Sequence, residues 1–191
     1  MSTEESARTD GALVSALQRE RDVMAFEMLM KRYQRPIFGF ILRQLGDRSR
    51  AEEVFQETFL RVYDKIDTCR DPNAFKPWAF TIAANLCRNE TRRQQVRRGE
   101  RPSGDGLETR APSTGPSPEG AAIASESRRE IERALQSLPD AQREVFVLYH
   151  YTRLSYEEIA SVLEVPVGTV KSRMNAALTA LRSLLVGLKE N

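Results

Sequence analysis

Apolar side chains recur at three- and four-residue intervals along most of the chain, which is the spacing of amphipathic α-helices. The first long stripe runs from Phe26 to Leu45. Gly46 follows directly, at the position of a helix C-cap. Pro36 falls inside the stripe, and because proline lacks the backbone N–H that a helix interior needs, we expect a kink or a break there.

Two further helices are predicted before residue 98. One carries the stripe from Ala51 to Ile66, with Ser49 placed to cap its start. Residues 67–73 are predicted to form a loop, because they end in Asp-Pro-Asn, a turn sequence. The next helix is expected to start near Pro77 or slightly before, and to end in an arginine-rich stretch.

The composition changes between residues 102 and 127. Half of these 26 residues are Pro, Gly or Ser and none is aromatic, which is typical of a flexible linker. Four carboxylates accompany a single arginine there, whereas residues 88–101 hold six arginines and two glutamates. The chain is therefore expected to consist of two units joined by a mildly acidic linker.

Helical spacing resumes after the linker. Pro139 is placed to start one helix, and Ser155 with Glu158 forms a capping box at the start of another. The last helix is expected over residues 169–188. Sustained alternation with a period of two is missing from the sequence, so no sheet is predicted. The predicted fold is all-α, with two small helical domains over residues 10–99 and 128–188 and a linker over residues 100–127.

The segment from Leu154 to Arg173 has the layout of a helix-turn-helix, in which the second helix enters the DNA major groove. Glu164 stands in the turn, where many repressors have glycine. The positions predicted to face outward can donate hydrogen bonds to bases or phosphates: Thr169, Lys171, Ser172, Arg173 and Asn175. A helical hairpin with a solvated polar face would show the same pattern, but the basic start of the second helix favours DNA.

Four arginines share one helix face upstream of the linker: Arg88, Arg92, Arg93 and Arg97. This face would attract phosphates, with an affinity that falls as the salt concentration rises. The alternative is a solvated helix C-terminus, which positive charge stabilises. Nearby aromatic rings, at Phe75, Trp78 and Phe80, could stack on unpaired bases, although core packing is the alternative for each of them.

Composition excludes several classes of protein. Of the 191 residues, 40% are hydrophobic and 29% are charged, with a net charge of +2, which rules out wholesale disorder. The apolar runs are far shorter than the roughly 20 residues of a membrane span, and the polar N-terminus lacks the features of a secretory signal, so we expect a cytoplasmic protein without membrane insertion.

Cys69 and Cys87 are isolated, so we expect reduced thiols and no zinc site or cofactor. The chain has one histidine and lacks the common catalytic motifs, so it has little general-base machinery. We therefore predict that it is not an enzyme.

Four motifs follow one another along the chain: EVFQETF at residues 53–59, PWAFTIAAN at 77–85, LP with REVF at 138–146, and LSYEEIA with PVGTVKSR at 154–173. In this order they resemble the sigma-70 family of bacterial transcription initiation factors, in its small extracytoplasmic-function (ECF) subgroup. The resemblance covers about residues 12–187. It implies a sigma region 2-like helical bundle and a sigma region 4-like helix-turn-helix. It also implies an alternative sigma factor, of the kind used in stress responses, that binds core RNA polymerase and directs it to promoters.

The resemblance assigns a role to each motif. Glu53, Gln56 and Glu57 would dock on the clamp helices of the polymerase β′ subunit, although Arg50 stands where relatives often have an acid. Residues that would recognise and melt the −10 element are Asn73, Phe75, Asn85, Arg88 and Arg92. Residues that would read the −35 element are Gly168, Thr169, Lys171, Ser172, Arg173 and Asn175.

The resemblance also implies partners. The second domain would contact the flap of the polymerase β subunit, and the acidic linker would thread a basic channel of the enzyme. An anti-sigma factor would hold the protein inactive. The protein would be a monomer when free, with promoter DNA and core polymerase as its working partners.

Two other classes of protein compete with this interpretation. A one-component helix-turn-helix regulator would bind a two-fold operator as a dimer, and a response regulator would need an α/β receiver, but the helical N-terminal half favours neither. A helical adaptor would bind proteins only, through the acidic face at residues 52–57, and its arginines would merely be solvated.

Overall fold

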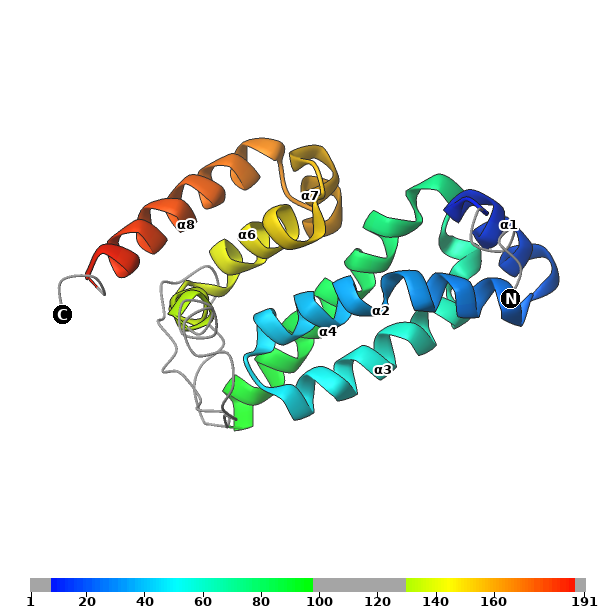
Figure 1. Ribbon diagram of the computed structural model, residues 1–191, viewed down its shortest axis with the longest axis horizontal. Coiled ribbons are helices and arrows are strands. Elements are labelled where there is room, and N and C mark those ends of the chain that lie inside the picture. Colours follow the sequence, from blue (N-terminus) through cyan, green and yellow to red (C-terminus); the bar gives the residue numbers. More distant parts are fainter. Residues whose placement is uncertain (1–7, 98–129, 188–191) are drawn as a thin grey trace, which may run out of the picture.

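The computed structural model describes residues 8–97 and 130–187, with side chains through residue 184. Every regular element in these ranges is helical (Figure 1). The helices before the gap are α1 (Asp10–Glu20), α2 (Val23–Leu45), α3 (Arg48–Asp64) and α4 (Phe75–Arg97), with short 3₁₀ turns at Ile66–Thr68 and Pro72–Ala74. After the gap, helical residues 130–136 lead to α6 (Asp140–Thr152), α7 (Tyr156–Leu163) and α8 (Val167–Gly187). The predicted linker, residues 100–127, lies wholly outside the described residues.

The N-terminal unit, helices α1 to α4, is a bundle in which α2, α3 and α4 pack on one another (Figure 1). Their apolar stripes meet in the centre, where the rings of Phe40 and Phe80 join α2 to α4 edge to face at 5.7 Å. The rings of Phe38 and Phe55 make the same kind of contact between α2 and α3 at 5.6 Å. The helical periodicity of the sequence is confirmed, and so is the C-cap at Gly46, which has a positive φ of 65°.

Pro36 does not break the helix, so of the kink or break expected from the sequence the break is ruled out. α2 continues through it from Val23 to Leu45. Proline removes one hydrogen bond from the helix. Tyr33 and Ile37, which flank it, are both buried in the core, so tertiary packing holds the helix together across the missing bond.

The start of α3 also differs from the expectation. The capping residue is Asp47, whose carboxylate accepts a hydrogen bond from the backbone N–H of Arg50 at 3.0 Å. Ser49 lies inside the helix instead. Both residue types are good caps, and sequence alone offered no means to choose between positions two residues apart. By contrast, α4 starts at Phe75, slightly before Pro77, as predicted.

The C-terminal unit, residues 130–187, contains the helix-turn-helix. Ser155 and Glu158 form the predicted capping box, with both reciprocal hydrogen bonds present, at 3.1 and 2.7 Å. Glu164 adopts the left-handed backbone conformation with a φ of 56°, which closes the turn between α7 and α8. Glycine is the usual residue in this conformation because it has no Cβ to clash. Glu164 therefore occupies the position in the turn that glycine occupies in many repressors.

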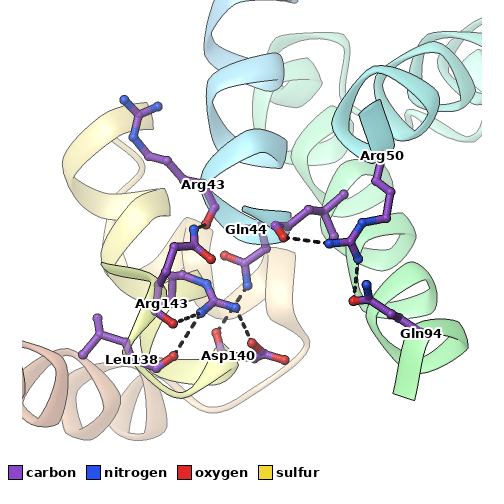
Figure 2. Close-up of polar contacts among 9 residues, drawn as sticks. Arg43, Gln44, Arg50, Gln94, Leu138, Asp140 and Arg143 are labelled. Atoms are coloured by element: carbon purple, nitrogen blue, oxygen red, sulfur yellow. Dashed lines mark hydrogen bonds and ion pairs between the residues drawn. The ribbon is translucent and has the colours of Figure 1, made fainter. Parts of the chain in front are cut away.

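A fully buried arginine fixes the corner before α6. Arg143 donates through Nη1 to the backbone carbonyls of Leu138, at 3.0 Å, and Gln136, at 3.3 Å. Its Nη2 pairs with the carboxylate of Asp140 (Figure 2). The guanidinium thus supplies donors to carbonyls that the helix ends leave unpaired.

The two units pack against each other, an arrangement that the sequence did not predict. α6 lies on α2, and α7 lies on α4. A single cluster of buried apolar side chains includes residues from both units, from Leu13 in α1 to Met174 in α8. The described helices therefore form one packed body.

We expect Arg143→Ala to lower the free energy of unfolding by about 3 kcal/mol, because buried carbonyl acceptors lose their donor. Arg133→Ala is the matched control, since Arg133 is exposed in the same unit, and it should change stability by less than about 0.5 kcal/mol. Urea unfolding followed by circular dichroism measures both. Equal midpoints for the two variants would contradict the structural role of Arg143.

Candidate nucleic-acid interface

The first turns of α8 present a polar face. Gly168, Lys171, Ser172 and Asn175 are exposed, and Thr169 and Arg173 are half-buried. On the opposite side of α8, Val170, Met174 and Ala177 are buried against the other helices of the unit. The structure thus brings together all the residues that the sequence assigned to the −35 element, on one end of one helix.

Gly168 stands out within this face. A Cβ placed on Gly168 would meet nothing within 4 Å, and the residue has no positive φ. Neither packing nor backbone conformation within the chain therefore requires glycine here. A close approach of the backbone to a partner is the remaining physical use of glycine at such a position.

The second face lies on α4. Asn85, Arg88 and Arg92 are exposed, and Arg88 Nη2 donates a hydrogen bond to Asn85 Oδ1 at 2.8 Å. Toward the end of the helix, an open hollow is lined by Asn89, Arg92, Arg93, Val96 and Arg97. The grouping of cationic side chains along one exposed helix face suits a polyanion such as a nucleic-acid backbone.

Phe75 does not belong to this face, which corrects the sequence-based assignment. Its side chain is 0% exposed, and its ring contacts Tyr33 at 5.2 Å and Trp78 at 5.8 Å between centroids. Phe80 is fully buried as well. Core packing explains both aromatic rings, because the helix that carries them must bury an apolar side against α2. Asn73, by contrast, is exposed in the 3₁₀ turn before α4.

A third face, on α3, is acidic. Glu53 and Gln56 are exposed, and Glu57 is partly exposed beside Arg61, whose Nε donates to its carboxylate at 2.7 Å. Leu60 lies on the same side, seven residues after Glu53, and its side chain is 62% exposed. The sequence reasoning missed Leu60. The sequence does contain an indication of its exposure: Leu60 falls outside the apolar stripe of α3, and it is separated from the acidic residues by helical spacing.

Arg50 does not extend this acidic face. Its side chain is mostly buried and reaches across to α4, where Nη1 donates to Gln94 Oε1 at 2.5 Å (Figure 2). Nη2 donates to the backbone carbonyl of Leu45 at 3.3 Å. Arg50 thus ties α3 to its neighbours, and its positive charge does not face outward beside Glu53.

The cysteines take no part in these faces. Cys69 and Cys87 are both buried free thiols. Burial raises the pKa of the Cys69 thiol to about 11, and it also raises the pKa of Cys87. Thiols with raised pKa values react slowly because the thiolate is the reactive form.

Known protein families match both units. The profile described as "Sigma-70 region 2" matches residues 29–97, and the profile described as "Sigma-70, region 4" matches residues 128–181. The RNA polymerase sigma-H factor of Pseudomonas aeruginosa is 34% identical over 185 residues, which cover 92% of this chain and 93% of that protein. This chain belongs to the sigma-70 family, in its ECF group. The ECF RNA polymerase sigma-E factor of Escherichia coli K12 is likewise 34% identical, over 91% of the sigma factor described here and 92% of its own length.

Two solved structures share the fold of this sigma factor. CnrH in complex with the cytosolic domain of CnrY has a TM-score of 0.69, at 24% identity over 94% of this chain and 99% of the other. The sigma factor RpoE in complex with the anti-sigma factor NepR from Bartonella quintana also has a TM-score of 0.69, at 24% identity over 85% of this chain and 98% of the other.

Family membership settles the general function. The protein is an alternative sigma factor, a transcription initiation factor that directs RNA polymerase to promoters, and it is not an enzyme. None of the helices in the described ranges combines the length and hydropathy of a membrane span. The same residues hold no group of three or more His, Cys, Asp or Glu placed to share a metal ion.

We expect Gly168→Ala to leave the stability of the sigma factor unchanged or to raise it by up to about 1 kcal/mol, because alanine favours the helix and meets no neighbour. Binding to promoter DNA should weaken, since the added methyl group keeps a phosphate or base edge away from the backbone. Thermal unfolding and fluorescence anisotropy with polymerase holoenzyme measure the two effects. Undiminished DNA binding would remove Gly168 from the contact surface.

Proposed function

We propose that this sigma factor docks on core RNA polymerase through α3, recognises and melts the −10 element through α4, and reads the −35 element through α8. One observation carries the proposal. The three exposed polar faces lie on three different helices, and each lies within residues that match the sigma region 2 or region 4 profile.

The acidic face of α3 suits a basic partner helix. Glu53, Gln56 and Glu57 offer carboxylates and an amide, and the exposed Leu60 adds an apolar contact in the same row. Apolar surface rimmed by polar residues is one arrangement found at protein–protein interaction sites. The clamp helices of the β′ subunit are the partner that we assign to this face.

The α4 face suits a DNA strand that is being separated from its complement. Unpairing costs a few kcal/mol, which new contacts to the exposed base must offset. Asn85 can hydrogen-bond to a base edge, while Arg88 and Arg92 supply positive charge to the phosphates. Asn73 would contact the same strand from the preceding turn.

The α8 face suits duplex DNA in the major groove. Lys171, Ser172 and Asn175 project from the first two turns, where a recognition helix contacts bases and phosphates. Polymerase would hold both units on one promoter, so that binding of one makes binding of the other effectively intramolecular. The β flap would contact the C-terminal unit, and the linker would thread the enzyme's channel, although its residues lie outside the described part of the chain.

An anti-sigma factor is proposed as a further partner. RpoE of Bartonella quintana, which shares this fold, was solved with one. The sigma factor would act in the cytoplasm, where core polymerase is, and as a monomer when free.

Run-off transcription tests the proposal as a whole. Purified bacterial core polymerase is incubated with and without the sigma factor on a library of genomic promoter fragments. New discrete transcripts that share two upstream elements are expected. Failure to bind core polymerase would refute the docking role proposed for α3.

We expect Glu57→Lys to weaken binding to core polymerase by at least about tenfold, because it reverses a charge in the docking face. Glu27→Lys is the matched control, since Glu27 is exposed on α2 and should tolerate the same reversal. Leu60→Ala should also weaken binding without loss of stability, because the side chain is 62% exposed. The affinity of each variant for core polymerase is measured by fluorescence titration with labelled sigma factor. Equal affinities of Glu57→Lys and Glu27→Lys would place the docking surface elsewhere.

We expect Lys171→Ala to weaken promoter binding by holoenzyme and to lower the slope of log affinity against log salt by about 1, as for loss of one phosphate contact. Lys31→Ala serves as the control, because Lys31 is exposed on α2, away from the recognition helix. Affinity for core polymerase should be unchanged in both variants. A parallel loss of polymerase binding in Lys171→Ala would argue against the separation of the two surfaces.

A further inference from the structure

The loop between α3 and α4, residues 65–74, carries Asn73 and leads directly into the α4 face. It consists mainly of the two short 3₁₀ turns, and we call it the α3–α4 loop. α1 packs against both turns, at the end of the N-terminal unit where the chain passes from α3 to α4 (Figure 1). The faces proposed above do not involve α1, which also precedes residues 29–97, the part that matches the region 2 profile.

Gln18, on α1, holds the backbone of the α3–α4 loop. Its Nε2 donates to the carbonyls of Ile66 and Cys69, at 2.9 Å each. An amide nitrogen carries two hydrogens, so both donors of this side chain are used. Ile66 begins the first 3₁₀ turn and Cys69 caps its end. One side chain from α1 therefore fixes both ends of the turn from which the chain continues to Asn73.

Further contacts hold α1 itself in place. At one end of the helix, the guanidinium of Arg21 pairs with the carboxylate of Asp67 in the loop. At the other end, the carboxylate of Asp10 accepts a hydrogen bond from the hydroxyl of Tyr33, on α2. The ring of Tyr33 in turn contacts the ring of Phe75, the first residue of α4, at 5.2 Å. α1 is thus tied to the elements on both sides of the loop.

Gly11 faces the side chain of Asn73. A Cβ placed on Gly11 would run into Oδ1 of Asn73 and would lie 3.2 Å from its Cγ. Gly11 has no positive φ, so the close approach of this amide is the local use of glycine here. The backbone of Asn73 is held separately, because its N–H donates to the carboxylate of Asp71 at 2.9 Å. Gly11 therefore governs the direction of the Asn73 side chain.

We propose that α1 is a positioning element for −10 recognition: Gln18 fixes the α3–α4 loop, and Gly11 leaves room for the direction in which the amide of Asn73 meets a base. Both are positioning residues that act through Asn73. The effect on DNA rests on the role proposed above for Asn73, whereas the contact between α1 and the loop does not.

The chemistry of an amide explains why its direction matters. The side chain of asparagine accepts through one atom and donates through the other, so its orientation decides which base edge it matches. A side chain that is already held in place also loses less conformational entropy when it binds. Support from α1 should therefore raise the discrimination between bases at one position of the −10 element.

The first experiment uses the free protein. Trp78 is the only tryptophan of the chain, and its Nε1 donates to Oγ1 of Thr68 in the loop at 3.3 Å. Gln18→Met keeps the length of the side chain and removes both donors. We expect the Stern–Volmer constant for acrylamide quenching of Trp78 to rise at least about twofold as the loop loosens. Gln34→Met is the matched control, because Gln34 is exposed on α2 and donates to a carbonyl of its own helix, and it should leave quenching unchanged.

The second experiment uses polymerase holoenzyme and a promoter fragment obtained by run-off transcription. The rate of open-complex formation is compared with the rates on fragments that are changed at single bases of the −10 or the −35 element. We expect Gly11→Ala to lower discrimination at one −10 base about fivefold, as for loss of one well-directed hydrogen bond. Preferences at the −35 element should be unchanged. Alanine favours the helix, so α1 should remain folded.

Two further variants make this result specific. Gly39→Ala adds the same methyl group to α2, where the end of the Arg43 side chain is the neighbour at 3.1 Å, and it should not change base preference. Asn73→Ala should lose the same discrimination as Gly11→Ala. In the Asn73→Ala background, Gly11→Ala should add nothing, because no amide is left to position. A general distortion of the unit by Gly11→Ala would persist in that background.

Three results would overturn the proposal: unchanged quenching in Gln18→Met, unchanged discrimination in Gly11→Ala beside a loss in Asn73→Ala, or an effect of Gly11→Ala that persists without the Asn73 side chain. Unaltered base preference in Asn73→Ala would overturn the role proposed above for Asn73, and with it the effect of α1 on DNA. The quenching experiment needs neither polymerase nor DNA, so it decides the contact between Gln18 and the loop separately.

Discussion

Burial of α4 is the constraint on which the rest of the structure depends. One side of this helix fills the core of the N-terminal unit through side chains such as Phe80 and Ala83, and α7 of the other unit packs on it as well. The side that remains carries Asn85 and Arg92 into solvent. Because the apolar contacts fix the rotation of the helix, they also decide which polar residues can meet DNA.

The sequence predicted most of the fold because helical periodicity and capping are local signals. The capping box at Ser155 and Glu158, the end of α2 at Gly46 and the start of α4 all followed from residue types at fixed spacing. The sequence could not choose between a kink and a break at Pro36, because the effect of a proline on a helix depends on what the neighbouring turns bury, which is a property of the tertiary structure. The cap at Asp47 was missed because two good capping residues stood close together.

The candidate surfaces were less predictable from the sequence than the helices. Residues at the start of α8 were found because their outward spacing is visible in the sequence. Phe75 was misplaced, since an aromatic residue beside a basic stretch looks the same whether its ring faces the core or solvent. The contact between the units had no local signal at all. A glutamate such as Glu144, in an amphipathic helix, gives no sign in the sequence that it will be buried.

The bonds of Arg143 have a mechanical consequence. All the acceptors that it holds, the carbonyls of Gln136 and Leu138 and the carboxylate of Asp140, belong to its own unit. Separating the units would break none of them. The corner between residues 130–136 and α6 is thus braced within the C-terminal unit, independently of the contacts that this unit makes with the N-terminal one.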